Sequence, residues 1–230
     1  MGFLKVSAKN WLRKRFGNIG ETLPGEGIPV FEDDIEFFNY FNQIRDITLV
    51  SPHRCFWIYQ MARHSNNLDG SFAQVGVYKG GTAKLISMVR NPSKSFYLFD
   101  TFEGLPKNDP NIDYHEKGEF AAGIDEVLPL FEGEPNVKIT KGIFPETAGI
   151  IPKPEKFAFV YSDVDLYDSN HAVLNFFYPR MTQGGVIMFD DYEWEHCPGI
   201  KKSIDDFLSE HGIKARPIIT TRYQAMLIKS

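Results

Sequence analysis

Apolar and polar positions follow two different periods along this chain. Short runs in which almost every position is hydrophobic predict strands buried on both faces, as in a parallel sheet. They occupy residues 72–77, 95–99, 137–141, 157–162 and 185–189. Helical spacing predicts helices at residues 33–45, 51–64, 82–90, 120–130, 169–177 and 200–211. Because strand and helix patterns alternate from residue 72 onward, the sequence predicts an α/β fold with a doubly wound, mostly parallel sheet.

The chain closes with two further β-like runs. They cover residues 215–220 and 223–229 and are close enough to pair as an antiparallel hairpin. Together with the five earlier runs they predict a seven-stranded sheet. Ligands of doubly wound sheets bind at the carboxyl ends of the strands, so the chemistry of this protein is expected there.

Composition divides the 230 residues into three parts. Residues 1–27 form a basic arm with a glycine-rich connector, residues 28–70 a helical lid or cap, and residues 71–230 the ligand-binding core. Residues 1–16 carry five basic and no acidic side chains, and the rest of the chain has 20 basic and 30 acidic ones, a net charge of −10. That balance argues against binding to nucleic acid.

The basic arm also carries apolar side chains and is compatible with an amphipathic helix. A substrate lid, a homodimer contact and a membrane-surface anchor are its functional interpretations, the last of them not favoured; a solvated helix packed on the core is the simplest. No run approaches the roughly 20 apolar residues that span a bilayer. The two cysteines lack metal-site spacing and fit reduced thiols, so a cytoplasmic protein is expected.

The most informative segment is the glycine-containing turn at residues 71–82, Ser-Phe-Ala-Gln-Val-Gly-Val-Tyr-Lys-Gly-Gly-Thr. It joins a predicted strand to a predicted helix, so backbone amides and a helix N-terminus face a small ligand there. Asp100 ends the next strand, where a carboxylate can accept both hydroxyls of a ribose. Val77 stands where the dinucleotide pattern has its second glycine. A nucleoside ligand without a pyrophosphate fits better, and S-adenosyl-L-methionine is the first candidate.

Acidic residues gather where the fourth and fifth predicted strands end. Asp163 and Asp165 follow the fourth strand, and Asp190 and Asp191 follow the fifth. Four carboxylates at neighbouring strand tips repel one another unless a cation neutralises them, and all-oxygen ligation suits Mg²⁺. Capping of the next helix, for which Asp168 is placed, is the structural alternative. A bound divalent ion acidifies a hydroxyl, so the metal interpretation favours methyl transfer to oxygen.

Five segments combine these features: Gln-Val-Gly-Val-Tyr-Lys-Gly-Gly-Thr (74–82), Phe-Asp-Thr-Phe-Glu-Gly-Leu-Pro (99–106), Lys-Gly-Ile-Phe-Pro-Glu-Thr (141–147), Ser-Asp-Val-Asp-Leu-Tyr-Asp-Ser (162–169) and Phe-Asp-Asp-Tyr (189–192). Together they resemble the macrocin O-methyltransferase (TylF-type) family, from about Thr48 to the C-terminus. The resemblance implies a Rossmann-like class I methyltransferase fold. It also implies Mg²⁺-dependent transfer of the methyl group of S-adenosyl-L-methionine to a sugar hydroxyl on an antibiotic or related saccharide.

The resemblance further implies roles for single residues. Asp163, Asp190 and Asp191 would bind Mg²⁺, and Asp165 would be the general base. Asp100 would hold the ribose, and Gly142 with Phe144 would line the adenine pocket. The full set of implied cofactor contacts is Gln74, Gly76, Tyr78, Lys79, Gly80, Gly81, Thr82, Asp100, Thr101, Phe102, Gly142, Phe144, Ser162, Asp163, Val50 and Ser51.

One position departs from the family pattern. Gln74 stands where the family usually has glutamate, which removes a charge near the cofactor and predicts weaker binding. Two histidines, His171 and His196, are alternative bases because a neutral imidazole is well matched to pH 7.

Two other functions stay open. A nucleotide-sugar glycosyltransferase would use Asp163-Val-Asp165 to hold a divalent ion, and a catalytically idle module would bind cofactor or a partner without turnover. Three aromatic residues, Trp57, Trp194 and Tyr192, are candidates to stack on a sugar. The sequence identifies neither the sugar nor the hydroxyl.

Overall fold

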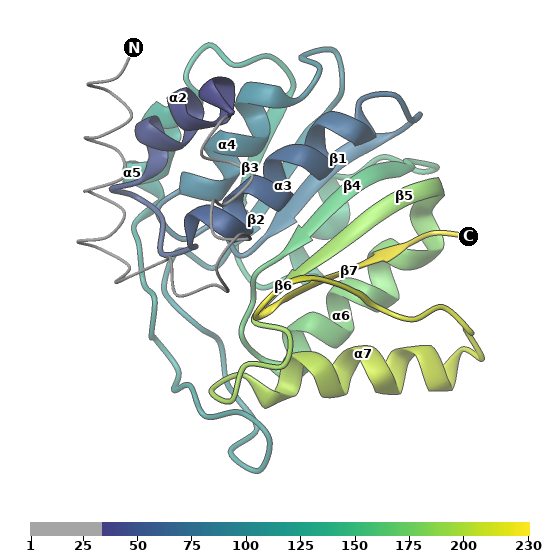
Figure 1. Ribbon diagram of the computed structural model, residues 1–230. Helices are drawn as coiled ribbons and strands as arrows, with labels where there is room; N and C mark the ends of the chain where they lie inside the picture. The colour runs from purple at the N-terminus through teal and green to yellow at the C-terminus, as the bar shows by residue number, and fades with distance from the viewer. Residues whose placement is uncertain (1–33) are drawn as a thin grey trace, which may run out of the picture.

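A seven-stranded sheet runs through the centre of the molecule (Figure 1). The computed structural model describes residues 34–230. The strands lie in the order β3-β2-β1-β4-β5-β7-β6, with the bounds β1 Ser71–Val75, β2 Phe96–Asp100, β3 Val137–Lys141, β4 Phe157–Ser162, β5 Met181–Asp190, β6 Ile218–Thr221 and β7 Gln224–Ile228. β1 to β5 pair in parallel, and β7 is antiparallel to both β5 and β6. The predicted α/β fold with a C-terminal hairpin is therefore confirmed.

Helices cover both faces of the sheet (Figure 1). One face carries α2 Ile35–Ile44, α3 Pro52–Ser65 and α4 Gly81–Val89, and the other carries α6 Tyr167–Phe177 and α7 Pro198–Glu210. Every residue of β1 and of β4 is buried, because side chains that alternate between the faces meet a helical layer on either side. The apolar runs of the sequence follow from this double burial.

Several elements differ from the sequence-based prediction. The predicted helix 120–130 is only one turn, α5 Ile124–Val127, followed by the 3₁₀-helix η2 Leu128–Phe131, since Pro129 lacks the N–H that an α-helix would use. β5 begins four residues before the predicted start and passes through Gly184 and Gly185. Two short 3₁₀-helices, η3 Glu146–Ile150 and η4 Tyr178–Arg180, were not predicted.

The predicted basic arm, residues 1–27, and residues 28–33 of the predicted cap lie outside the described residues. Within residues 34–230, no helix combines the length and the apolar character that crossing a bilayer requires.

Candidate functional site

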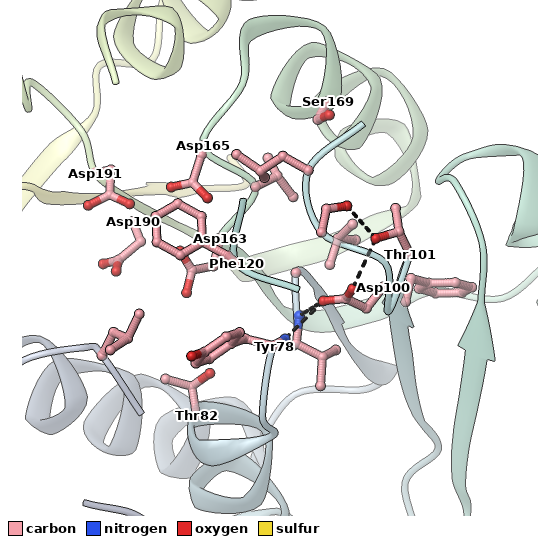
Figure 2. Close-up of a pocket in the computed structure, with 18 of the residues that line it drawn as sticks. Tyr78, Thr82, Asp100, Thr101, Phe120, Asp163, Asp165, Ser169, Asp190 and Asp191 are labelled. Carbon is pink, nitrogen blue, oxygen red and sulfur yellow. Dashed lines mark hydrogen bonds between the residues drawn. The ribbon is translucent and has the colours of Figure 1, made fainter. Parts of the chain in front are cut away.

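A pocket lies at the carboxyl ends of β1, β2, β4 and β5 (Figure 2). This is where a doubly wound sheet binds its ligands. The glycine turn and Asp100 lie towards one end of it, and the acidic residues gather at the other. Most of the residues predicted for the site line this pocket: Val50, Gly76, Tyr78, Gly81, Thr82, Asp100, Thr101, Gly142, Phe144, Asp163, Asp165, Asp190 and Asp191.

Asp100 organises the glycine turn. Its Oδ2 accepts hydrogen bonds from the backbone N–H groups of Val77 (2.6 Å) and Tyr78 (2.9 Å), and its Oδ1 accepts one from Phe102 N–H (2.6 Å). Three charge-assisted bonds to one carboxylate fix the tip of β2 against the turn that follows β1. The carboxylate is thus a structural part of the pocket wall, whatever it contacts in a ligand.

Glycine is required where the turn meets the acidic strand. Gly76 has φ +84°, and a Cβ at this position would lie 1.7 Å from the carbonyl oxygen of Asp163. The backbones are in direct register there, since Asp163 N–H donates to the carbonyl of Val75 at 3.0 Å. Only a residue without a side chain lets the glycine turn and the acid-bearing loop approach so closely.

The N-terminus of α4 opens onto the pocket without a side-chain cap. Its N-cap residue, Gly80, has a left-handed backbone (φ +84°), and no acidic residue stands in the first turn. Gly81 and Thr82, the first two helical residues, line the pocket. Backbone N–H groups and the positive end of the helix dipole are therefore available to an anionic group, such as the carboxylate of an amino acid.

Four carboxylates meet at the other end of the pocket (Figure 2). Carboxylate oxygens of Asp163, Asp165 and Asp191 all lie within 4.8 Å of one another. Asp190 is 2% exposed and joins them through a cation, because Arg54 Nη1 bonds both Asp190 Oδ2 (2.7 Å) and Asp191 Oδ1 (2.9 Å). The oxygen-rich donor set fits a hard divalent ion such as Mg²⁺.

Asp163 and Asp165 follow the end of β4, which lies at Ser162 as the sequence predicts. Beyond the strand, Asp165 adopts a left-handed backbone with φ +58°, which the sequence did not predict. Asp191, at the end of β5, does the same with φ +56°. Left-handed backbone at residues other than glycine is strained and is frequent at functional sites.

Burial and the crowding of the acids raise their pKa values. Burial is the largest cause for Asp163, and the charges of Asp190, Asp191 and Asp165 add to it. Burial also raises the pKa of Asp165, together with the charge of Asp191 and a hydrogen bond to it. The pKa of Asp190 rises to about 7 because burial outweighs the lowering effect of Arg54. Raised carboxyl pKa values are expected where several acids share a buried site that holds too little positive charge to balance them.

Six of the predicted site residues are outside the pocket wall. Ser51 caps α3 by accepting the N–H of Arg54 (3.4 Å), and Ser162 donates to Asn170 Oδ1 (2.8 Å) beneath the sheet end. Gln74 is fully buried and donates to the carbonyl of Gly76 (2.7 Å) and to Thr82 Oγ1 (2.8 Å). The others are Lys79, Gly80 and Phe102.

The amide of Gln74 is suited to its surroundings. Its Nε2 donates to a carbonyl oxygen, which a carboxylate in the same position could not do. Its Oε1 is buried with no hydrogen-bond partner among the described residues. Gln74 therefore contributes to the shape of the turn by donating, a role that the comparison with glutamate did not predict.

The histidine nearest to the acids is not one of the two predicted from the sequence. His171 bonds Glu210 at 3.1 Å on the outer side of α6, and His196 is exposed beside Glu195. A ring nitrogen of His115, by contrast, lies within 4.8 Å of both Asp165 and Cys197. His115 is in the long segment between β2 and α5, where no periodic pattern marks it.

Nδ1 of His115 is 2.6 Å from Glu119, and its Nε2 is buried without a partner among the described residues. A carboxylate that orients an imidazole in this way leaves the second nitrogen as an acceptor. The ring packs edge-on to Phe120 (5.2 Å between centroids) and is 6.1 Å from Trp194.

Phe120 and Trp194 themselves line the pocket, next to the acidic end. Of the three aromatic residues proposed from sequence to stack on a sugar, Trp194 thus lines the pocket, and Trp57 and Tyr192 do not. Tyr192 is 6% exposed in the core, and Trp57, a residue of α3, is partly buried against the core. Phe120 was not predicted, because it stands in a segment without regular structure.

Comparison with known proteins identifies the family. The sequence model described as Macrocin-O-methyltransferase (TylF) matches residues 59–228. Demethyldecarbamoylnovobiocin O-methyltransferase of Streptomyces niveus is 26% identical over 164 residues, which cover 64% of this chain and 62% of that protein. A second relative, 8-demethyl-8-(2,3-dimethoxy-alpha-L-rhamnosyl)-tetracenomycin-C 4'-O-methyltransferase of Streptomyces olivaceus, is 26% identical over 165 residues, 65% of this chain and 62% of its own.

Among solved structures, the calicheamicin methyltransferase CalS11 superposes with a TM-score of 0.70 at 19% identity, over 97% of this chain and 91% of CalS11. At that identity the likeness shows the fold alone. The matched region spans 62% of the length of the two curated relatives. The family match covers most of the chain, including the glycine turn and all four strand-end acids, and the chain belongs to the macrocin O-methyltransferase family.

Proposed function

We propose that this protein transfers the methyl group of S-adenosyl-L-methionine to a hydroxyl group of a sugar or a glycosylated small molecule, with the help of Mg²⁺. One observation carries the proposal. The same pocket joins an uncapped helix N-terminus and a glycine turn at one end to four carboxylates at the other. A nucleoside cofactor with an amino-acid tail suits the first end, and an ion with an oxygen nucleophile suits the second.

The glycine turn supports S-adenosyl-L-methionine as cofactor. The first N–H groups of α4, at Gly81 and Thr82, are placed for the carboxylate of the methionine part. Asp100, Gly142 and Phe144 all line the pocket; in this proposal Asp100 would contact the ribose, and Gly142 and Phe144 would contact the adenine.

The acids support a divalent ion. Asp163, Asp190 and Asp191 would hold it, with Asp165 beside them. When bound, Mg²⁺ would lower the pKa of a coordinated substrate hydroxyl and orient it towards the methyl group. The raised pKa values of Asp163 and Asp190, caused first by burial and then by neighbouring acids, support this role, because a bound divalent cation would favour their ionised forms.

Asp165 is the proposed proton acceptor. It lies within reach of the other acids, and Cys197 Sγ donates to its Oδ1 at 3.7 Å. We expect Asp165→Asn to lower kcat about 10²–10⁴-fold, the usual contribution of a positioned base, with cofactor affinity nearly unchanged. His171→Ala and His196→Ala serve as controls that retain activity, because neither residue lines the pocket. If Asp165→Asn keeps its kcat while His115→Gln loses it, the base is His115.

The substrate class rests on the family and on the shape of the acidic end. Both relatives named above are O-methyltransferases of natural products, and the name of the second specifies a rhamnosyl substrate. Trp194 and Phe120 supply flat apolar surfaces beside the acids, suited to the C–H face of a sugar ring.

Thermal unfolding with added ligands tests the proposal. S-adenosylhomocysteine should raise the Tm, and turnover should stop in excess EDTA and return with Mg²⁺. Stabilisation by UDP and Mn²⁺, without any effect of S-adenosylhomocysteine, would favour the glycosyltransferase alternative. Binding of S-adenosylhomocysteine without turnover of any glycosylated acceptor would favour the idle module.

A further inference from the structure

Arg54 occupies a position that the proposed metal ion also requires. It stands in the first turn of α3, 136 and 137 residues before the two acids that it contacts, and its side chain is 18% exposed. A single nitrogen, Nη1, contacts Asp190 Oδ2 at 2.7 Å and Asp191 Oδ1 at 2.9 Å. The two carboxylate oxygens contact one cationic atom in the way that two oxygen ligands contact a metal ion.

The protein also satisfies the remaining oxygen of Asp190. Gln224 Nε2 lies 3.3 Å from Asp190 Oδ1, so both oxygens of this buried carboxylate have partners within the chain. Asp163, Asp165 and Asp191 are arranged differently, since their oxygens approach one another within 4.8 Å. Arg54 is the single cationic side chain among the described residues that line the pocket.

A guanidinium and a divalent ion repel each other strongly at a separation of a few ångströms in a site shielded from water. Mg²⁺ bound to Asp190 and Asp191 would lie at roughly 2.0–2.1 Å from their oxygens, and therefore next to Nη1. Arg54 and the metal ion therefore cannot both bind this pair of carboxylates tightly at the same time. Arg54 also lines the open pocket, so its long side chain has space into which it can withdraw.

We propose that Arg54 is an internal counter-cation, which holds Asp190 and Asp191 when no metal is bound and releases them when a divalent ion binds. The inference rests on the proposed metal dependence. Arg54 is in this sense a positioning residue: it keeps the acids together in the metal-free protein, and its charge weakens the affinity for metal. Metal uptake is then an exchange of one cation for another.

Mn²⁺ binding, followed by electron paramagnetic resonance, tests the exchange. Arg54→Gln removes the charge and should bind Mn²⁺ at least tenfold more tightly than wild type, whereas Arg54→Lys keeps a charge and should stay near wild type. Arg63→Gln is the matched control on the same helix, because Arg63 pairs with Glu36 on an exposed surface. Asp191→Asn should abolish binding in the wild-type and the Arg54→Gln backgrounds alike, which places the signal at the acids.

The outcomes separate this inference from the proposed function. Tighter binding in Arg54→Gln than in wild type supports the exchange. Binding by Arg54→Gln alone, with none in wild type, overturns it, because Arg54 would then never release the acids in the unaltered protein. Equal or weaker binding in Arg54→Gln overturns the exchange and leaves metal dependence standing. If neither wild type nor Arg54→Gln binds Mn²⁺, the exchange and the proposed metal dependence are both overturned.

A second measurement uses the unaltered protein, in case Arg54→Gln folds poorly without a counter-cation. In ¹⁵N side-chain NMR spectra, the guanidinium of Arg54 should show hindered rotation in EDTA, because Nη1 is held by two carboxylates. Saturating Mg²⁺ should release the guanidinium, so that its rotation becomes fast and its NH₂ resonances average to one signal. A resonance that Mg²⁺ leaves unchanged overturns the exchange.

Discussion

A single glycine at the end of β1 allows the backbone of the glycine turn to approach the backbone of Asp163. Gly76 and Gly133 both have positive φ angles, +84° and +75°. Only Gly76 is also crowded, because an added Cβ would lie 1.7 Å from the Asp163 carbonyl oxygen, whereas nothing lies within 4 Å of a Cβ at Gly133. Gly76→Ala should therefore lower the free energy of unfolding by roughly 3 kcal/mol or more, and Gly133→Ala by about 1 kcal/mol. Urea denaturation of both variants measures the difference; equal losses would mean that the contact relaxes at no cost.

The two thiols give a second test at the residue scale. Cys55 and Cys197 are buried and free, and burial next to acidic groups raises the pKa of both. The thiolate is the reactive form, so neither cysteine should react appreciably with DTNB in the folded protein. Both should react at once in guanidinium chloride. Rapid reaction of one thiol under native conditions would show that its surroundings open.

Contacts at this scale also show what the sequence could not predict. Asp163, Asp165, Asp190 and Asp191 were found from their places after apolar runs, because parallel strands end at one edge of the sheet. Arg54 lies on a helix 136 residues before Asp190 and has no local pattern that points to the acids. The left-handed backbone of Asp165 likewise depends on tertiary contacts rather than on its neighbours in sequence.

At the scale of elements, the start of α3 distinguishes capping from cofactor binding. Ser51 accepts the N–H of Arg54 and does not line the pocket. Ser51→Ala should lower the free energy of unfolding by about 1 kcal/mol, as lost caps usually do, and change the affinity for S-adenosylhomocysteine little. Asp34→Ala, which removes the cap of α2 far from the acids, is the matched control. A loss of cofactor affinity with Ser51→Ala alone would show that Ser51 contacts the cofactor.

Elements were predictable where burial determined the pattern. β3 and β4 have the bounds expected from their apolar runs, and the Ser51-Pro52 start of α3 follows from capping chemistry. The segment between β2 and α5 had no such signal, since it folds over the pocket without periodic burial. It supplies Phe120 and His115, so the part of the site proposed to contact substrate was the least predictable part.

For the whole molecule, the acids connect stability to pH. The pKa of Asp190 rises from 3.8 to about 7 on folding, with burial as the largest cause, and those of Asp163 and Asp165 rise as well. Between about pH 4 and pH 7 the unfolded chain has released these protons while the folded protein retains them. The folded state then binds more protons, so stability should be greatest below the unfolded pKa and fall as the pH rises towards 7.

Unfolding in EDTA at several pH values between about 5 and 7.5 measures this effect. The free energy of unfolding of Asp190→Asn should depend less on pH than that of wild type, because the variant lacks one of the shifted carboxyl groups. With saturating Mg²⁺ the wild-type trend should reverse, since a metal ion binds the ionised carboxylates and its affinity rises with pH. If the free energy of unfolding of Asp190→Asn and of wild type has the same slope against pH in EDTA, other groups govern the pH dependence, and folding does not raise the pKa of Asp190.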